Sequence, residues 1–145
     1  MITDMKTFSF ELVSPEERLM SQEAEMVSIP GGEGDFGVLP NHAAILSTIR
    51  PGVIKVYTKR DDATPPKHVF VAGGFADVTP VSCSVLAEEA FDLEDLEEAD
   101  VLKEIGALED RIEKAKNEIE AERLTKRIAV ENMKLDALRA YKAAA

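Results

Sequence analysis

The stretch Pro-Gly-Gly-Glu-Gly-Asp-Phe-Gly-Val-Leu-Pro-Asn-His, residues 30–42, has the densest run of turn-forming residues in the chain, and the sequence around it is organised accordingly. Its segment 32–37 matches the G-x-G-x-x-G pattern of dinucleotide sites, where glycines let the backbone approach a pyrophosphate at a helix N-terminus. We reject that match, because Pro40 follows soon after the last glycine and disfavours the helix that such a site requires. Glu33 and Asp35 would also repel a phosphate. The stretch is therefore predicted to be a cluster of turns with several positive-φ positions.

Short segments with strand character flank this stretch on both sides. Before it, Thr7 to Val13 alternates apolar and polar residues, and Arg18 to Ile29 forms a second extended piece in which Ala24, Met26 and Ser28 share one face. After it, strand-like runs separated by Gly and Pro cover residues 43–49, 53–57, 68–72, 75–79 and 82–87, and Cys83, Val85 and Ala87 share one face of the last run. Many short strands without alternating helices predict a small β-sandwich or barrel.

The composition changes at about Glu88. From there to the C-terminus the sequence contains one glycine and no proline, and Ala, Glu, Lys and Leu dominate, so this segment is predicted to be helical. One apolar stripe comprises Val101, Ile105, Leu108, Ile112, Ala115 and Ile119, and a second, shifted in phase, comprises Leu124, Ile128, Leu135 and Leu138. The phase break at 117–122 predicts a turn, with one long helix as the alternative.

Charge favours a helical hairpin over one long helix. Asp and Glu crowd residues 88–122, whereas basic residues mark the last segment: Arg123, Lys126, Arg127, Lys134, Arg139 and Lys142. In an antiparallel hairpin the acidic helix lies beside the basic one, and each surface pair contributes roughly a few tenths of a kcal/mol. We predict a segregated α+β protein, with a β-sandwich domain at 1–89 and a two-helix antiparallel hairpin at 90–145.

Composition excludes several classes of function. The chain has 145 residues, a formal net charge of −11 and a pI near 4.6, which argue against nucleic acid or an anionic membrane surface as the main partner. A single cysteine, Cys83, cannot form an internal disulfide, which fits a reducing compartment. No signal peptide or run of membrane-spanning length is evident. We therefore expect a soluble, intracellular protein without direct membrane insertion.

The sequence offers no constellation for catalysis or metal binding. His42 and His68 have no Cys, Asp or Glu at ligand spacing, so we expect no zinc site, and no arrangement of Ser, His and Asp stands out. His42 is expected to bond the backbone of the glycine-rich stretch. We predict no cofactor and no enzymatic activity.

Five short motifs, in this order and spacing, resemble those of the epsilon subunit of the bacterial F-type ATP synthase, whose mitochondrial counterpart is called delta. They are Val13-Ser14-Pro15, Gly32 to His42 followed by Ala43, Arg50-Pro51-Gly52, Gly73-Gly74-Phe75 with Val78, and Val85-Leu86-Ala87-Glu88 before a helical tail. The resemblance covers nearly the whole chain. It implies a flattened N-terminal β-sandwich and a C-terminal helical hairpin.

The resemblance also implies a non-catalytic rotor subunit at the cytoplasmic face of the bacterial inner membrane. In that family the sandwich clamps the foot of the gamma shaft and touches the polar loops of the c-ring, so that proton flow through the ring turns the shaft and drives ATP synthesis. By analogy, the c-ring contact falls at Glu33 and Asp35, with His42 beside them. The two carboxylates would pair with basic groups on the ring loops.

The resemblance further implies that the helices can extend into the catalytic hexamer of alpha and beta subunits and restrain ATP hydrolysis. Arg123, Lys126 and Arg127 are the candidates for pairing with acidic surfaces there, and pairing with the acidic first helix is the alternative. Family members that bind ATP have an Ile/Leu-Asp-x-x-Arg-Ala motif early in the first helix. Here the aligned residues 93–98 read Leu-Glu-Asp-Leu-Glu-Glu, with Glu97 in place of the arginine, so we predict no ATP binding.

Two other functions compete with this interpretation. A free-standing β-sandwich adaptor with a coiled-coil dimerisation tail would be a dimer in gel filtration, whereas an intramolecular hairpin predicts a monomer. A small hydrolase would require a polar pocket that contains His42 or His68.

Overall fold

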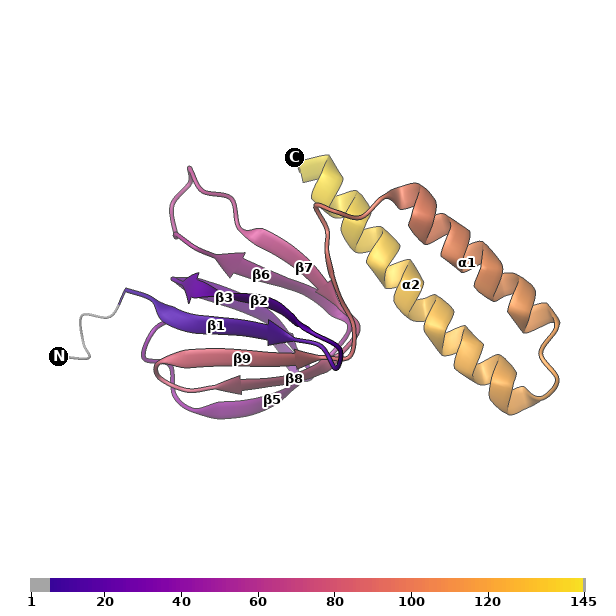
Figure 1. Cartoon of the computed structure of the whole chain (residues 1–145), viewed down its shortest axis with the longest axis horizontal. Helices are drawn as coiled ribbons and strands as arrows, with labels where there is room; N and C mark the ends of the chain where they lie inside the picture. Colours follow the sequence, from indigo (N-terminus) through magenta and orange to yellow (C-terminus); the bar gives the residue numbers. More distant parts are fainter. Residues whose placement is uncertain (1–5, 145) are drawn as a thin grey trace. The chain divides into compact units, whose positions relative to one another are not determined.

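The computed structural model describes residues 6–144, and the chain divides at Asp92/Leu93 into a β unit and a helical unit. The β unit contains ten strands in its described part (Figure 1). They are β1 (Phe8–Val13), β2 (Arg18–Ala24), β3 (Met26–Gly31), β4 (Gly34–Val38), β5 (Ile45–Ile49), β6 (Gly52–Tyr57), β7 (Lys67–Val71), β8 (Gly74–Val78), β9 (Ser82–Ala87) and β10 (Ala90–Asp92). Because β10 pairs with β7, residues 90–92 belong to the β unit and not to the helical domain predicted to begin at residue 90.

The strands form a β-sandwich from one continuous sheet, in the order β10-β7-β6-β3-β5-β8-β9-β1-β2, with β4 paired to β3. The two halves meet where β3 and β5 pair through Gly31 and Ile49. Most neighbours are antiparallel, but β1 and β9 run parallel. The predicted sandwich is confirmed, and the connection at Gly31 brings the glycine-rich stretch to the seam between its halves.

The chain crosses from one half of the sandwich to the other at Glu25, and this crossing changes which residues face the core. β2 pairs with β1, whereas β3 pairs with β4 and β6. The prediction that Ala24, Met26 and Ser28 share one face is wrong, since Ala24 is buried whereas Met26 and Ser28 are partly exposed. Val27 and Ile29 are buried instead. A break in a strand shifts the two-residue alternation to the other face, and sequence periodicity alone does not reveal it.

Both halves contribute to one apolar core. Alternation along β1 buries Phe8, Phe10 and Leu12, and alternation along β9 buries Cys83, Val85 and Ala87, as the sequence predicted. Complete burial of a Phe or Leu side chain contributes about 1.5–3 kcal/mol. The polar segment between β6 and β7 lies outside this core.

The helical unit is an antiparallel pair, α1 (Glu98–Glu113) and α2 (Glu118–Ala144), which lie side by side (Figure 1). The predicted hairpin is confirmed and the single long helix is wrong. The turn occupies 114–117, slightly before the predicted window, because the Asn117 side chain accepts a hydrogen bond from the Glu120 amide (2.8 Å) and caps α2. Ile119 therefore lies in the first turn of α2, 81% exposed, and does not extend the apolar stripe of α1.

Candidate functional site

The glycine-rich stretch is a β-hairpin rather than a run of turns. Its strands are β3 and β4, and Gly32 and Glu33 form the two-residue connection, with Gly31 paired to Gly34. Two residues of the stretch have the predicted positive φ: Gly34 at the start of β4 (φ +140°) and Asn41 after the hairpin (φ 67°). A Cβ atom on Gly32 would overlap the Thr48 hydroxyl oxygen, so a larger residue here would force the Thr48 side chain of β5 to move.

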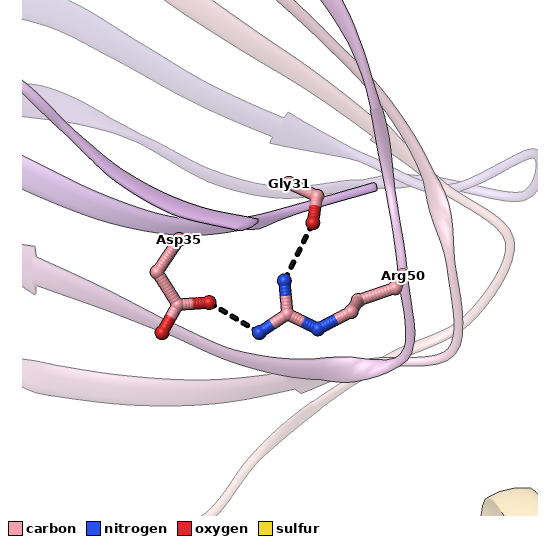
Figure 2. Close-up of polar contacts among 3 residues, drawn as sticks. All are labelled: Gly31, Asp35 and Arg50. Carbon is pink, nitrogen blue, oxygen red and sulfur yellow. Dashed lines mark hydrogen bonds and ion pairs between the residues drawn. The ribbon is translucent and has the colours of Figure 1, made fainter. Parts of the chain in front are cut away.

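Arg50, just after β5, joins the two strands of this hairpin. Its Nη1 donates to the Gly31 carbonyl oxygen (2.5 Å), and its Nη2 donates to the Asp35 carboxylate (Figure 2). Two backbone bonds reinforce the contact: the Arg50 amide donates to Pro30 (3.0 Å), and the Gly32 amide donates to Thr48 (2.8 Å). The end of β5 therefore holds the hairpin through both main chain and side chain.

The three residues predicted for the c-ring contact have different surroundings. Asp35 is paired within the chain to Arg50, whereas exposed Glu33 takes part in no ion pair among residues 6–144. His42 bonds a backbone, but its Nδ1 lies 2.6 Å from the carbonyl oxygen of its own neighbour Ala43 rather than from the hairpin. The expected bond to the glycine-rich stretch is therefore wrong, since the stretch is a hairpin whose strands bond each other.

An apolar row on the outer face of the sandwich was not predicted from the sequence. Phe75 in β8 pairs with Leu86 in β9, which pairs with Val13 in β1, and the first two side chains are 52% and 55% exposed. Leu46 in β5, also on this face, is 71% exposed. We call Val13, Leu46, Phe75 and Leu86 the outer apolar row. The sequence could have revealed this row through apolar residues at positions where strand alternation predicts polar ones. Exposed apolar surfaces of this kind mark interaction sites.

Burial shifts the pKa values of two side chains in the β unit, Cys83 and His68. Burial, with a smaller contribution from the Asp77 charge, raises the pKa of the Cys83 thiol to about 12, so the nucleophilic thiolate is absent near neutral pH. Burial also lowers the pKa of His68. Among residues 6–144, no group of three or more His, Cys, Asp or Glu side chains is placed to hold a metal ion.

In the helical unit, ion pairs join the start of α1 to the end of α2. Arg139 Nε lies 2.6 Å from the Glu98 carboxylate, and Lys142 Nζ lies 3.9 Å from that of Glu97. The expected pairing of acidic and basic helices is thus present at this end of the hairpin. Glu97, which replaces the arginine of the ATP motif, precedes α1, so residues 93–97 lie before the helix rather than early in it.

The other predicted basic residues lie near the turn of the hairpin. Lys126 Nζ is 3.9 Å from Glu122, and Arg127 is 3.3 Å from the buried Glu131, both on α2 itself. A hollow of about 360 Å³ lies between the helices, and three guanidinium groups line it with one carboxylate and two leucines: Arg111, Arg123, Arg127, Glu104, Leu108 and Leu124. The structure therefore brings Arg123 and Arg127 together and adds Arg111 from α1.

No helix in the described part of the chain has the length and apolar content needed to cross a membrane. The fold is shared with solved structures of low sequence identity. A chain of the Euglena gracilis mitochondrial ATP synthase, solved as OSCP/F1/c-ring, has a TM-score of 0.67 at 20% identity, with 97% of this chain and 82% of that chain covered. A chain of the Tetrahymena thermophila mitochondrial ATP synthase central stalk and c-ring has a TM-score of 0.51 at 16% identity, with 63% and 69% covered.

Sequence comparisons identify the family. Residues 7–92 match the model of the ATP synthase delta/epsilon chain β-sandwich domain. The chain is 50% identical over 115 residues to the ATP synthase epsilon chain of Rhodospirillum rubrum, with 79% of this chain and 84% of that protein covered. It is 48% identical over 130 residues to that of Rhodospirillum centenum, with 88% of each covered. The chain therefore belongs to the family of ATP synthase epsilon chains, non-catalytic subunits of that enzyme.

Proposed function

We propose that this chain is a central-stalk rotor subunit of the F-type ATP synthase, which links the gamma shaft to the c-ring and so couples proton flow to ATP synthesis. Membership of the epsilon family supports this role. The observation that carries it is the outer apolar row, an exposed apolar surface on one face of the sandwich. Such a surface serves to bind another protein.

The outer apolar row is assigned to the gamma shaft. Phe75 and Leu86 are directly paired across β8 and β9, so a partner that covers them covers both at once. Covering a large apolar side chain contributes about 1.5–3 kcal/mol, which makes these two side chains the main anchors. The close-packed core beneath them deforms little, and this is a suitable property for a part that transmits torque.

The β3–β4 hairpin is assigned to the c-ring, with Glu33 as the principal contact. Glu33 lies at the connection, and its carboxylate is exposed, whereas Asp35 is engaged by Arg50. A basic group on the ring loops would complement Glu33, and His42 is a second, half-buried candidate. Held through such contacts with other subunits, the protein is peripheral at the cytoplasmic face of the bacterial inner membrane.

A pull-down from solubilised membranes tests both assignments. The double variant F75E/L86E should lose the gamma subunit, while L102E/M133E, which makes the same change at two exposed apolar positions of the helical unit, should keep it. E33K should reduce retention of the c-ring at moderate salt without affecting the gamma subunit. Retention of both partners by all these variants would show that the protein docks through other surfaces.

The helical unit is assigned an inhibitory role on ATP hydrolysis through contacts with the alpha and beta subunits. The hollow between the helices supports this, because the Arg111 and Arg123 guanidinium groups that line it suit the carboxylates of an acidic surface. Lys126 lies on α2, as Arg123 does, whereas Arg127 is engaged by Glu131. Truncation after Asp92, which keeps β10 in the sheet, should leave assembly intact and raise ATPase activity. Unchanged activity of a fully assembled complex would contradict the inhibitory role.

Binding of ATP by the helical unit is not expected. The position of the motif arginine holds Glu97, whose carboxylate faces Lys142, and Glu98 beside it faces Arg139. Arg139 and Lys142 are thus engaged by carboxylates of the chain, and Glu97 supplies no cation where the motif has arginine. Isothermal titration of the purified protein with ATP should therefore give no binding heat, and a saturable heat at physiological ATP concentration would contradict this prediction.

A further inference from the structure

We propose that Arg50 is a positioning residue for the c-ring contact: it ties the β3–β4 turn to β5 and neutralises Asp35, so that Glu33 alone is presented to the partner. This inference rests on the proposed role of Glu33. It assigns different tasks to two carboxylates that the sequence makes look equivalent.

The geometry shows one guanidinium group bridging the hairpin (Figure 2). Gly31 belongs to β3 and Asp35 to β4, and the turn at Glu33 lies between them in sequence. Arg50 donates to the Gly31 carbonyl oxygen and, from its other terminal nitrogen, to the Asp35 carboxylate. A planar guanidinium presents donors in a fixed fork, so both acceptors are held at a set spacing, which a lysine ammonium does not achieve.

The hairpin needs such a brace because its own structure restrains it weakly. Among the described residues, β4 pairs with β3 and with no other strand. The chain around the turn contains Gly31, Gly32 and Gly34, and glycines lose the most conformational freedom on ordering. The end of β5 is the structure that restrains this side of the turn, through Thr48, which accepts from the Gly32 amide, and through Arg50.

The contribution of Arg50 is local rather than global. The Arg50 and Asp35 side chains are 45% and 69% exposed, and ion pairs exposed to this degree contribute little to the free energy of unfolding. The pair instead cancels one of the two acidic charges near the turn. A partner with a single cation at this place then meets one carboxylate, Glu33, in a defined position.

Amide hydrogen exchange of the isolated protein tests the brace directly. The Gly32 amide reports on it, because its bond to Thr48 joins the turn to β5. In R50Q this amide should exchange about tenfold faster while the melting temperature stays close to that of the parent. R50K should also exchange faster, since it keeps the charge but not the fork, and D35N should show a smaller effect because the bond to Gly31 persists. Unchanged exchange in R50Q would overturn the proposal.

Retention of the c-ring in pull-downs separates this inference from the function on which it rests. E33Q should lose retention with unaltered Gly32 exchange, R50Q should lose it together with faster exchange, and D35N should largely keep it. If E33Q loses the ring but R50Q with a loosened turn retains it, positioning by Arg50 is wrong and the ring contact stands. If E33Q retains the ring, the contact at Glu33 is wrong, and the exchange of R50Q still decides whether Arg50 braces the turn.

Discussion

Alanine substitution at three glycines should separate backbone strain from steric overlap. Gly74 begins β8 with φ +147°, and a Cβ atom there would lie 2.1 Å from the Leu86 carbonyl oxygen of β9. Gly34 begins β4 with φ +140°, but a Cβ atom there would meet no atom within 4 Å. Gly106 lies inside α1 and also has open space around it. The same chemical change thus meets three different environments.

The magnitudes follow from these environments. A side chain in the positive-φ region costs about 1–3 kcal/mol, so G34A and G74A share this destabilisation. G74A must in addition displace the backbone of β9, and forcing extra atoms into a packed region costs about 1–3 kcal/mol more. G106A should stabilise the helical unit by about 0.5–1 kcal/mol, because alanine is favoured over glycine inside a helix.

Thermal unfolding followed by far-UV circular dichroism measures these differences. For a unit of this size, 1 kcal/mol corresponds to about 4–8 °C, so G74A should melt at least about 4 °C below G34A, and G34A below the parent. G106A controls for the effect of an added methyl group by itself. Equal melting temperatures for G34A and G74A would refute the steric argument, and a parent-like G34A would refute the strain argument.

Three further predictions concern side-chain interactions. A double-mutant cycle with E98Q and R139Q should give a coupling free energy of about 0.3–1 kcal/mol, measured by urea unfolding followed through the helical circular dichroism signal. This coupling free energy should decrease as the salt concentration rises, and its absence at low salt would contradict the ion pair between the helices. Burial raises the pKa of the Cys83 thiol to about 12, so this thiol should react with thiol reagents at pH 8 only when the β-sandwich unfolds locally. Added urea should accelerate the labelling, and rapid labelling without urea would contradict the burial of Cys83. Hydrogen bonds from Thr64 lower the pKa of Asp61 from 3.8, so the ionised form of Asp61 favours the folded state. D61N should therefore melt at a lower temperature than the parent at neutral pH, and this difference in melting temperature should disappear as the pH falls through the lowered pKa. A difference that stays constant with pH would contradict the linkage.

The sequence predicted those features that depend on local periodicity. Alternation located the buried faces of β1 and β9, and the loss of Gly and Pro after Glu88 located the helices. Pro40 was enough to exclude a dinucleotide fold. The family resemblance, carried by short motifs in order, was confirmed by the comparisons over most of the chain.

Features that depend on which strands become neighbours were missed. Val27 and Ile29 face the core because the chain changes halves at Glu25, and no residue pattern marks that crossing. The outer apolar row becomes visible only when Phe75 and Leu86 are seen to be paired and exposed. A strand with apolar residues on both faces is predicted from its sequence to be fully buried, so the exposure of one face goes unnoticed.

The glycine-rich hairpin shows the division most clearly. The sequence by itself determined that residues 30–42 turn the chain without forming a phosphate site, because glycine freedom, proline geometry and like-charge repulsion act locally. Only the tertiary structure decided that Asp35 pairs with Arg50 and that Glu33 does not. That pairing depends on β5 ending beside β3, where Gly31 meets Ile49, and a contact between residues fifteen positions apart is set by the order of strands in the sheet rather than by either local sequence.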